Sequence, residues 1–399
     1  MIFRFAFRNV LRNRKRSFLT ALTIFFAAII ASVAQAWING IVNVYVDNYT
    51  KYQTGHVRVC TEEFIRREKF LPVDEVIPDS ASLIESLSQI RGVRAVRERI
   101  RMGMLLSSNG NTVQSMGFGV DLLNSEMQIQ KKLVQGSMTG SGMYVGWRLA
   151  EKLRIKPGDE LLIATKTSEG GLNGIKLRVE GIVRLGMMFD KKCFFMSLED
   201  AKRLLKIHGG TTEIYLYGND IEMADRIKAA AVPMLPEWIR AETYREQLGE
   251  FYTTLENMKA IYGFIEMLIL FLASFVIINT MMMAIFERLR EIGTIKAMGM
   301  TDRELFMNFT LEGSILGAAG GIPGAVAGFL LIMLVSQKGI DFSSQLQSIE
   351  MPFEYILRPV VEITDLLTAV GMAIFVPAIA AMIPARYARK LMPSEALRK

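Results

Sequence analysis

The residues that could carry out chemistry are few and widely separated in this sequence of 399 residues. The two histidines, His56 and His208, and the two cysteines, Cys60 and Cys193, do not have the spacing of a zinc site. No Gly-Lys dipeptide is present, so the chain lacks a Walker A loop for ATP phosphates. The HExxH, GxSxG and CxxC patterns are also missing. We therefore expect no catalytic residue, no metal site and no cofactor in this chain.

The charged segment with the most informative spacing is ERLREIGTIKAMGM, residues 287–300. Apolar residues recur in it at every third position, which predicts an amphipathic helix, and a glycine follows as a plausible helix end. Its charges are mixed and it has no aromatic residue, which favours docking on a protein partner over lying on lipid headgroups. The candidate docking residues are Glu287, Arg288, Arg290, Glu291, Ile292, Gly293, Lys296 and Gly299.

Four long apolar runs must position this segment. Apolar residues make up 51% of the chain, and each run approaches or exceeds the roughly 20 residues needed to cross a hydrocarbon core. The expected spans are 18–46, with an outer extension, then 261–286, 313–335 and 366–385. Between them we expect an outer domain at 47–235, a stalk helix at 236–260, a docking helix and loop at 287–312 and a short outer loop at 336–365.

The first run could also be a cleaved signal peptide, because Ala34-Gln-Ala36 resembles a signal-peptidase site. The run is longer than the apolar part of a typical signal, however, and continues without charge past Trp37 toward Tyr45. We therefore expect a retained helix.

Basic residues predict the orientation. Six lie before the first span without any acidic residue: Arg4, Arg8, Arg12, Arg14, Lys15 and Arg16. Five more follow the last span in the tail 386–399. Both the basic N-terminus, 1–17, and this tail are therefore expected in the cytoplasm. The docking segment is then cytoplasmic too, and the long segment between the first two spans faces outward.

The outward segment has the pattern of a folded α+β domain, with one lobe or two. Strands are expected at 55–59, 92–100 and 112–120, and a helix capped by Asp79 or Ser80 follows the first of them. A hairpin is expected around KTSEGGLNGIK, with Gly170-Gly171 and Asn173-Gly174 at its tip. The fold class is thus a membrane protein with four transmembrane helices and a large extracytoplasmic α+β domain between helices 1 and 2. Cys60 and Cys193 both fall in that domain, and separate buried thiols are favoured over a disulfide.

The third span is rich in glycine at intervals of four residues. Small residues at this spacing let membrane helices approach closely. The expected packing positions are Gly313, Gly317, Gly321, Gly324 and Gly328, with Gly320 extending the second row. A phosphate-binding loop is disfavoured, because no strand precedes these glycines and no basic residue follows them. The nearest acidic residue to a span is Glu266, which we interpret as an outer-interface residue.

Two motifs make the chain resemble FtsX-like/MacB-type ABC permeases. The first is Glu287-Arg288, Arg290–Gly293 and Lys296–Met300, which is similar to the family's coupling helix. The second lies near the C-terminus and comprises Pro384, Ala385, Arg389, Pro393, Glu395, Ala396 and Leu397. TGHVRV, GVDLLNSE and LAEKLRIKPGDELLI also resemble the periplasmic domain of lipoprotein-releasing permeases of the LolC/LolE type.

The resemblance implies a permease subunit in the bacterial inner membrane. Two such permeases, identical or different, would pair above two copies of a P-loop ATPase subunit, which binds the ATP and Mg²⁺ that this chain cannot bind. The coupling helix would transmit ATPase closure to the outer domains. These would extract a lipoprotein from the outer leaflet and pass it to a periplasmic carrier, without moving it through a channel. No nucleic-acid partner is implied.

The resemblance also leaves alternatives open. The chain could be a MacB-like efflux permease for a peptide, antibiotic or toxin, or an FtsX-like regulator of a cell-wall hydrolase. LolC-type permeases grip their carrier with a hairpin hook, and the corresponding stretch here contains Glu169, Gly170, Gly171, Leu172 and Asn173. This stretch lacks proline and could equally be an ordinary hairpin.

Overall fold

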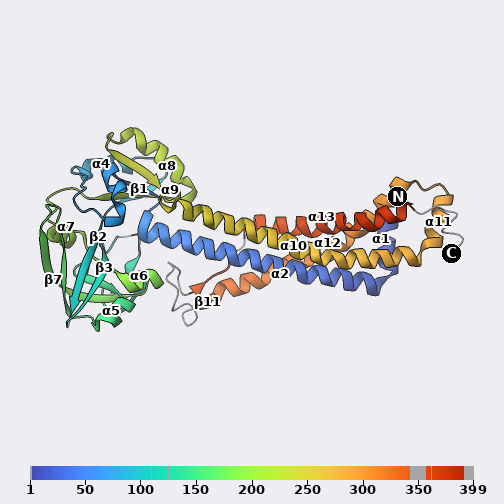
Figure 1. Cartoon of the computed structure of the whole chain (residues 1–399), viewed down its shortest axis with the longest axis horizontal. Coiled ribbons are helices and arrows are strands. Elements are labelled where there is room, and N and C mark those ends of the chain that lie inside the picture. The colour runs from blue at the N-terminus through green and yellow to red at the C-terminus, as the bar shows by residue number, and fades with distance from the viewer. Residues whose placement is uncertain (1, 109, 125, 342–355, 361, 391–399) are drawn as a thin grey trace. The chain divides into compact units, whose positions relative to one another are not determined.

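The computed structural model describes residues 2–108, 110–124, 126–341, 356–360 and 362–390 (Figure 1). Its contacts divide the chain into two compact units. The helical unit contains residues 1–43, 253–340 and 357–399, and the outer unit contains residues 44–252 and 341–356. The C-terminal motif residues Pro393, Glu395, Ala396 and Leu397 lie outside the described residues.

The helical unit is built on four helices that are long and apolar enough to cross a membrane. The helix α1 precedes the first long helix, and α11 lies between α10 and α12. Between α12 and α13, the short strands β11 and β12 pair with each other. The bounds are α1 Ile2–Arg12, α2 Arg14–Tyr49, α10 Glu250–Glu287, α11 Leu289–Ala297, α12 Asp302–Lys338, β11 Ile340–Asp341, β12 Ile356–Leu357 and α13 Ile363–Lys390. The four expected spans lie within α2, α10, α12 and α13, so the fold class predicted for this part is confirmed.

Glycines on α12 bring the long helices together in two rows. One row faces α13: a Cβ built on Gly313 would lie 2.3 Å from the Cβ of Ala381. The other row faces α2: a Cβ built on Gly324 would lie 2.5 Å from the carbonyl oxygen of Phe25. Both distances are shorter than any real side chain tolerates. The spacing of four residues therefore serves packing within this chain, on two sides of one helix.

The outer unit is organised around a sheet in the order β10-β1-β9-β2-β3-β8-β5-β7-β4, with β6 pairing both β2 and β7. The long strand β2 pairs with β9 along its first half and with β3 and β6 further on. The strand bounds are β1 Val57–Thr61, β2 Val93–Ser108, β3 Asn111–Val120, β4 Leu133–Gly136, β5 Met143–Gly146, β6 Glu160–Lys166, β7 Leu172–Val183, β8 Cys193–Ser197, β9 Glu213–Gly218 and β10 Ile239–Thr243.

Because β6 pairs with both β2 and β7, the strands β2, β3, β8, β5, β7 and β6 form a closed circuit of neighbours. Alternating residues of these strands fill one core, including Met102, Ile163, Val179 and Phe194. Closure leaves these strands without an unpaired edge. β10, β1 and β9 extend the sheet beyond β2, and residues 44–252 belong to the same compact unit.

Short helices pack around these strands. Their bounds are α3 Glu62–Arg66, α4 Ser80–Ser88, α5 Trp147–Leu153, α6 Met187–Lys192, α7 Leu198–Leu205, α8 Ala224–Ala231 and α9 Tyr244–Leu248. Single turns lie at η1 Thr50–Thr54, η2 Glu68–Phe70, η3 Ile129–Lys132, η4 Ile221–Met223 and η5 Val232–Met234. Asp79 caps α4 by accepting a hydrogen bond from the backbone of Ser82, as predicted. Cys60 and Cys193 are buried, separate thiols.

The predicted stalk helix at 236–260 is wrong over its first half. Residues Ile239–Thr243 form β10, which pairs antiparallel with β1, and α10 begins only at Glu250. The amphipathic pattern of this stretch fits a helix, but its partner strand lies about 180 residues away in the sequence and supplies ladder hydrogen bonds that no local pattern reveals. The expected loop before the third span is also shorter, because α12 already begins at Asp302.

Candidate coupling surface and the cavity beneath it

The predicted docking segment forms α11, a short helix set off from the long helices on either side. The backbone of Arg288 leaves the helical region, with φ −112° and ψ 17°, and so separates α11 from the end of α10. After Ala297, Gly299 adopts φ +106°, a conformation that favours glycine. Thr301 then starts α12 with a capping box that it forms with Glu304. The sequence thus specifies both ends of α11.

One face of α11 is buried and the opposite face is exposed. Ile292 and Gly293 are buried, and Ile292 packs in a cluster with Leu305 and Phe309 of α12. The exposed stripe comprises Arg290, Thr294, Ala297 and Met298, and Met298 is 74% exposed. These positions are spaced by four, three and one residues, so they share one side of the helix. A partner could reach this stripe but not Arg288, Ile292 or Gly293.

Most of the charges predicted to dock on a partner form ion pairs within this chain. Glu287 pairs with Arg16 at 2.7 Å, and Glu291 pairs with Arg12 at 2.6 Å. Lys296 pairs with Asp302 at 2.9 Å and donates to the carbonyl oxygen of Arg389 at 3.1 Å. These contacts tie α11 to α1, to the start of α12 and to the end of α13.

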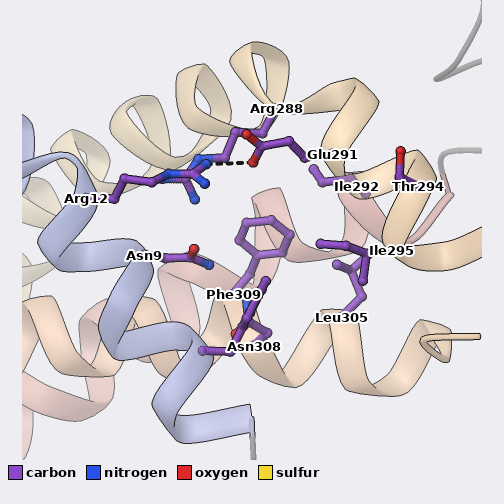
Figure 2. Close-up of a pocket in the computed structure, with 11 residues that line it drawn as sticks. Asn9, Arg12, Arg288, Glu291, Ile292, Thr294, Ile295, Leu305, Asn308 and Phe309 are labelled. Atoms are coloured by element: carbon purple, nitrogen blue, oxygen red, sulfur yellow. Dashed lines mark hydrogen bonds and ion pairs between the residues drawn. The ribbon is translucent and has the colours of Figure 1, made fainter. Parts of the chain in front are cut away.

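A cavity of about 370 Å³ lies between α1, α11 and the first turns of α12 (Figure 2). Phe5, Ile295, Leu305 and Phe309 form part of its apolar wall, while polar groups come from Asn9, Arg12, Arg288, Glu291 and Asn308. Figure 2 shows Arg12 and Glu291 joined across one side of the cavity and Asn9 facing it from α1. Burial lowers the pKa of Arg288 from its ordinary value, although a guanidinium stays protonated at neutral pH.

The hairpin predicted to contact a carrier is present in the outer unit. β6 and β7 pair from Glu160↔Arg178 to Lys166↔Leu172, so Asn173 lies inside the ladder and not at the tip as predicted. The tip is held against the end of α7, because Ser168 donates from its backbone to the carbonyl oxygen of Leu205 at 2.9 Å. Asn173 donates to the carbonyl oxygen of Leu204 at 2.8 Å. Leu172, at 90% exposure, is the most exposed large apolar residue at this hairpin.

Sequence reasoning missed a buried charge network in the outer unit. Arg58 and Arg101 both bind the fully buried Glu213, at 3.3 Å and 2.6 Å, and both bind Glu68. Burial would raise the pKa of Glu68, but the hydrogen bonds and charges of the two arginines outweigh burial and lower it to about 2. The network joins β1, β2 and β9, so no short motif could have indicated it.

Arg99 on β2 is a second residue that the sequence did not single out. Its guanidinium donates to the backbone carbonyl oxygens of Lys51, Tyr52 and Gln53, at 3.3, 3.0 and 3.4 Å. It also stacks on the ring of Tyr215 at 4.0 Å. Arg99 therefore caps the turn that follows α2 and fixes it to the sheet of the outer unit.

Comparison with known proteins gives a family match for one part of the chain and relatives for most of it. Residues 263–393 match the family described as FtsX-like permease C-terminal. The lipoprotein-releasing system transmembrane protein LolC of Neisseria meningitidis serogroup B is 23% identical over 353 residues, which are 82% of this chain and 83% of LolC. LolE of Haemophilus influenzae is 21% identical over 79% of this chain and 74% of its own length.

The macrolide export ATP-binding/permease protein MacB of Hyphomonas neptunium is 25% identical, but only over 38% of this chain and 21% of MacB. The matched family region contains α11, and with it both rows of packing glycines on α12. The four candidate membrane helices and the large outer unit agree with this assignment. Residues 263–393 thus form an FtsX-like permease domain, and the chain is similar to LolC and LolE of lipoprotein-releasing systems over most of its length and to the ABC permease MacB over a shorter part.

Proposed function

We propose that this chain is the membrane subunit of an ABC transporter that extracts lipoproteins from the outer leaflet of the bacterial inner membrane. It would work as one of two paired permeases above two copies of a separate P-loop ATPase, which binds ATP and Mg²⁺. The main support for an ATPase partner is α11. Its exposed stripe of Arg290, Thr294, Ala297 and Met298 follows directly after the candidate membrane helix α10. The lipoprotein cargo is supported by the LolC and LolE relatives.

In this proposal α11 acts as a lever. Its buried face packs on α12, and it follows α10 after a single non-helical residue, Arg288. α10 is one helix from Glu250 to Glu287, so displacement of α11 by ATPase closure would move α10 as a rod. The basic residues of α1 and of the end of α13 support a cytoplasmic position for both termini and α11, and the outer unit would then lie in the periplasm. Cargo would be pushed by the outer unit, without passing through a channel.

The docking face is tested by Met298→Asp. We expect this charge in the middle of an apolar contact to lower co-purification of the ATPase at least about tenfold, because an interface anchor is typically worth 2 kcal/mol or more. Met234→Asp is the matched control, since Met234 is also exposed but belongs to the outer unit. Retention of the ATPase by Met298→Asp at the level of the control would refute the docking face.

Removing Glu287 and Glu291 is a less specific test. Glu291 pairs with Arg12 of α1 and Glu287 pairs with Arg16 of α2, so their loss would also release α1 from α11 and α2 from the end of α10.

The cargo is tested by pull-down of the chain from its native membrane in mild detergent, followed by mass spectrometry of proteins and acyl chains. A co-purified ATPase with enriched triacylated lipoproteins would support lipoprotein release. An ATPase with an outer-membrane duct would instead indicate efflux of a peptide, antibiotic or toxin. An ATPase with a cell-wall hydrolase, and no lipoprotein, would indicate a regulatory role.

A further inference from the structure

The cavity beneath α11 contains buried polar atoms that no described residue satisfies. Nη2 of Arg288 and Oδ1 of Asn308 both lack a hydrogen-bond partner, although these residues are only 7% and 1% exposed. Both residues line the cavity. A buried donor or acceptor without a partner is strongly unfavourable, so such atoms require either ordered water or a ligand. Here the ligand must accept from a guanidinium and donate to an amide carbonyl.

A second unsatisfied acceptor lies on α12, close in sequence to Asn308. Glu312 is one helical turn beyond Asn308, is buried, and has Oε2 without a partner among the described residues. The other cation at the cavity, Arg12, is already paired with Glu291. The groups with unsatisfied atoms are therefore the guanidinium of Arg288, the amide of Asn308 and the carboxyl group of Glu312, which interacts electrostatically with Arg288. They match a headgroup that carries both a phosphate and a cationic N–H donor.

The remaining wall of the cavity requires an apolar part of the ligand. Phe5, Ile292, Ile295, Leu305 and Phe309 supply most of that wall. Water could satisfy the polar atoms but would wet the apolar side chains at a cost. An amphiphile with a compact polar headgroup fits both kinds of surface.

The position of α1 indicates that the amphiphile is a membrane lipid. α1 ends at Arg12 and the first membrane helix begins at Arg14. Its outer side exposes Phe3, Phe7 and Leu11 next to arginines, the composition of a helix that lies among lipid headgroups. The cavity between α1 and α12 would then open at the level of the phosphates of the inner leaflet.

We propose that this cavity binds one glycerophospholipid, whose phosphate accepts from Arg288 and whose headgroup donates to Asn308. Phosphatidylethanolamine has the required N–H donors, whereas phosphatidylcholine has the same phosphate and net charge without them. The bound lipid lies against Ile292 and Ile295 of α11 and reaches Thr294, which also belongs to the stripe proposed to face the ATPase. Lipid and α11 would then shift together when the lever moves.

The experiment measures lipid retained by the purified full-length chain in native mass spectrometry, with either phospholipid added. We expect the wild type to retain phosphatidylethanolamine about tenfold better than phosphatidylcholine. Arg288→Gln should lower retention of both lipids, because in both the same phosphate accepts from Arg288. Asn308→Leu should remove only the preference between them. Arg303→Gln is the matched control, because it removes the same charge at an exposed position of α12 outside the cavity. It should change neither the amount of lipid retained nor the preference between the two lipids.

Two further arms distinguish the lipid from other occupants. Ile295→Trp should reduce retention by filling the cavity while leaving Arg288 in place, and thermal melts of each variant verify folding. Soluble phosphoethanolamine should not displace the lipid at equal concentration. Displacement by it, equal retention of the two phospholipids by the wild type, or loss of the lipid when the ATPase docks would each overturn the proposal. The last result would mean that a side chain of the partner fills the cavity.

Discussion

Gly324→Ala tests whether the glycine rows of α12 hold the helical unit together. The Cβ of the new alanine would lie 2.5 Å from the carbonyl oxygen of Phe25 and 2.9 Å from the Cβ of Ala28. The first contact is to backbone, so no rotamer change can relieve it, and α2 and α12 must separate by about half an ångström or more. Overpacking of this kind typically costs about 1–3 kcal/mol.

A helix interior also gains up to about 1 kcal/mol when glycine becomes alanine. The expected net loss for Gly324→Ala is therefore about 0.5–2 kcal/mol, measured as a lower apparent melting temperature in detergent. Gly371→Ala is the matched control, because this glycine of α13 has no atom within 4 Å of a built Cβ. It keeps the propensity gain without the clash, so its melting temperature should equal or exceed that of the wild type. A Gly324→Ala protein as stable as Gly371→Ala would refute the packing role.

Three further outcomes are expected in the outer unit. Because the pKa of Glu68 is lowered to about 2, its ion pairs stabilise the fold above pH about 4.5, its ordinary pKa, and this stability is lost as the pH falls toward 2. The side chain is 37% exposed, so screening reduces the benefit to about 1–2 kcal/mol; the difference in melting temperature between wild type and Glu68→Gln should shrink over that pH range. Arg99→Lys should lower the melting temperature and speed hydrogen exchange of residues 51–53, since an ammonium cannot reproduce the planar fork; unchanged exchange would exclude the capping role. Deleting Glu169–Gly171 and closing the turn should spare assembly with the ATPase but weaken any periplasmic carrier contact, and a carrier bound as tightly as before would remove the hairpin from the carrier site.

The elements that the sequence predicted well are those whose signal is local. Membrane helices are identified by apolar length alone, and the spans fall within α2, α10, α12 and α13. The rows of small residues on α12 follow from spacing, and the cap of α4 from one aspartate. In each case the determining residues lie within a few turns of one another.

The elements that were missed depend on partners far away in the sequence. β10 was taken for a helix because its partner, β1, lies at residues 57–61. Arg58, Arg101 and Glu213 meet only after β1, β2 and β9 have paired. The sheet also extends β2 to Ser108, well beyond the predicted end at residue 100, since β3 and β6 provide hydrogen bonds on both sides of it. Strand pairing of this kind is set by tertiary context and not by propensity.

The docking segment shows how both kinds of information act on one helix. Its sequence correctly predicts an amphipathic helix, but it does not show which of the charged residues form ion pairs within this chain. Glu291 pairs with Arg12 of α1, 279 positions earlier, and Glu287 pairs with Arg16 at the start of α2, 271 positions earlier. The first pair holds α11 in place, and the second holds the end of α10. The face left for an ATPase contains Arg290, Thr294, Ala297 and Met298, and the exposed Glu291 beside them is already paired with Arg12. Recognition of an ATPase on that face must therefore depend mainly on shape and apolar contact. The ion pairs of α11 instead determine how rigidly it is attached to the neighbouring helices of this chain.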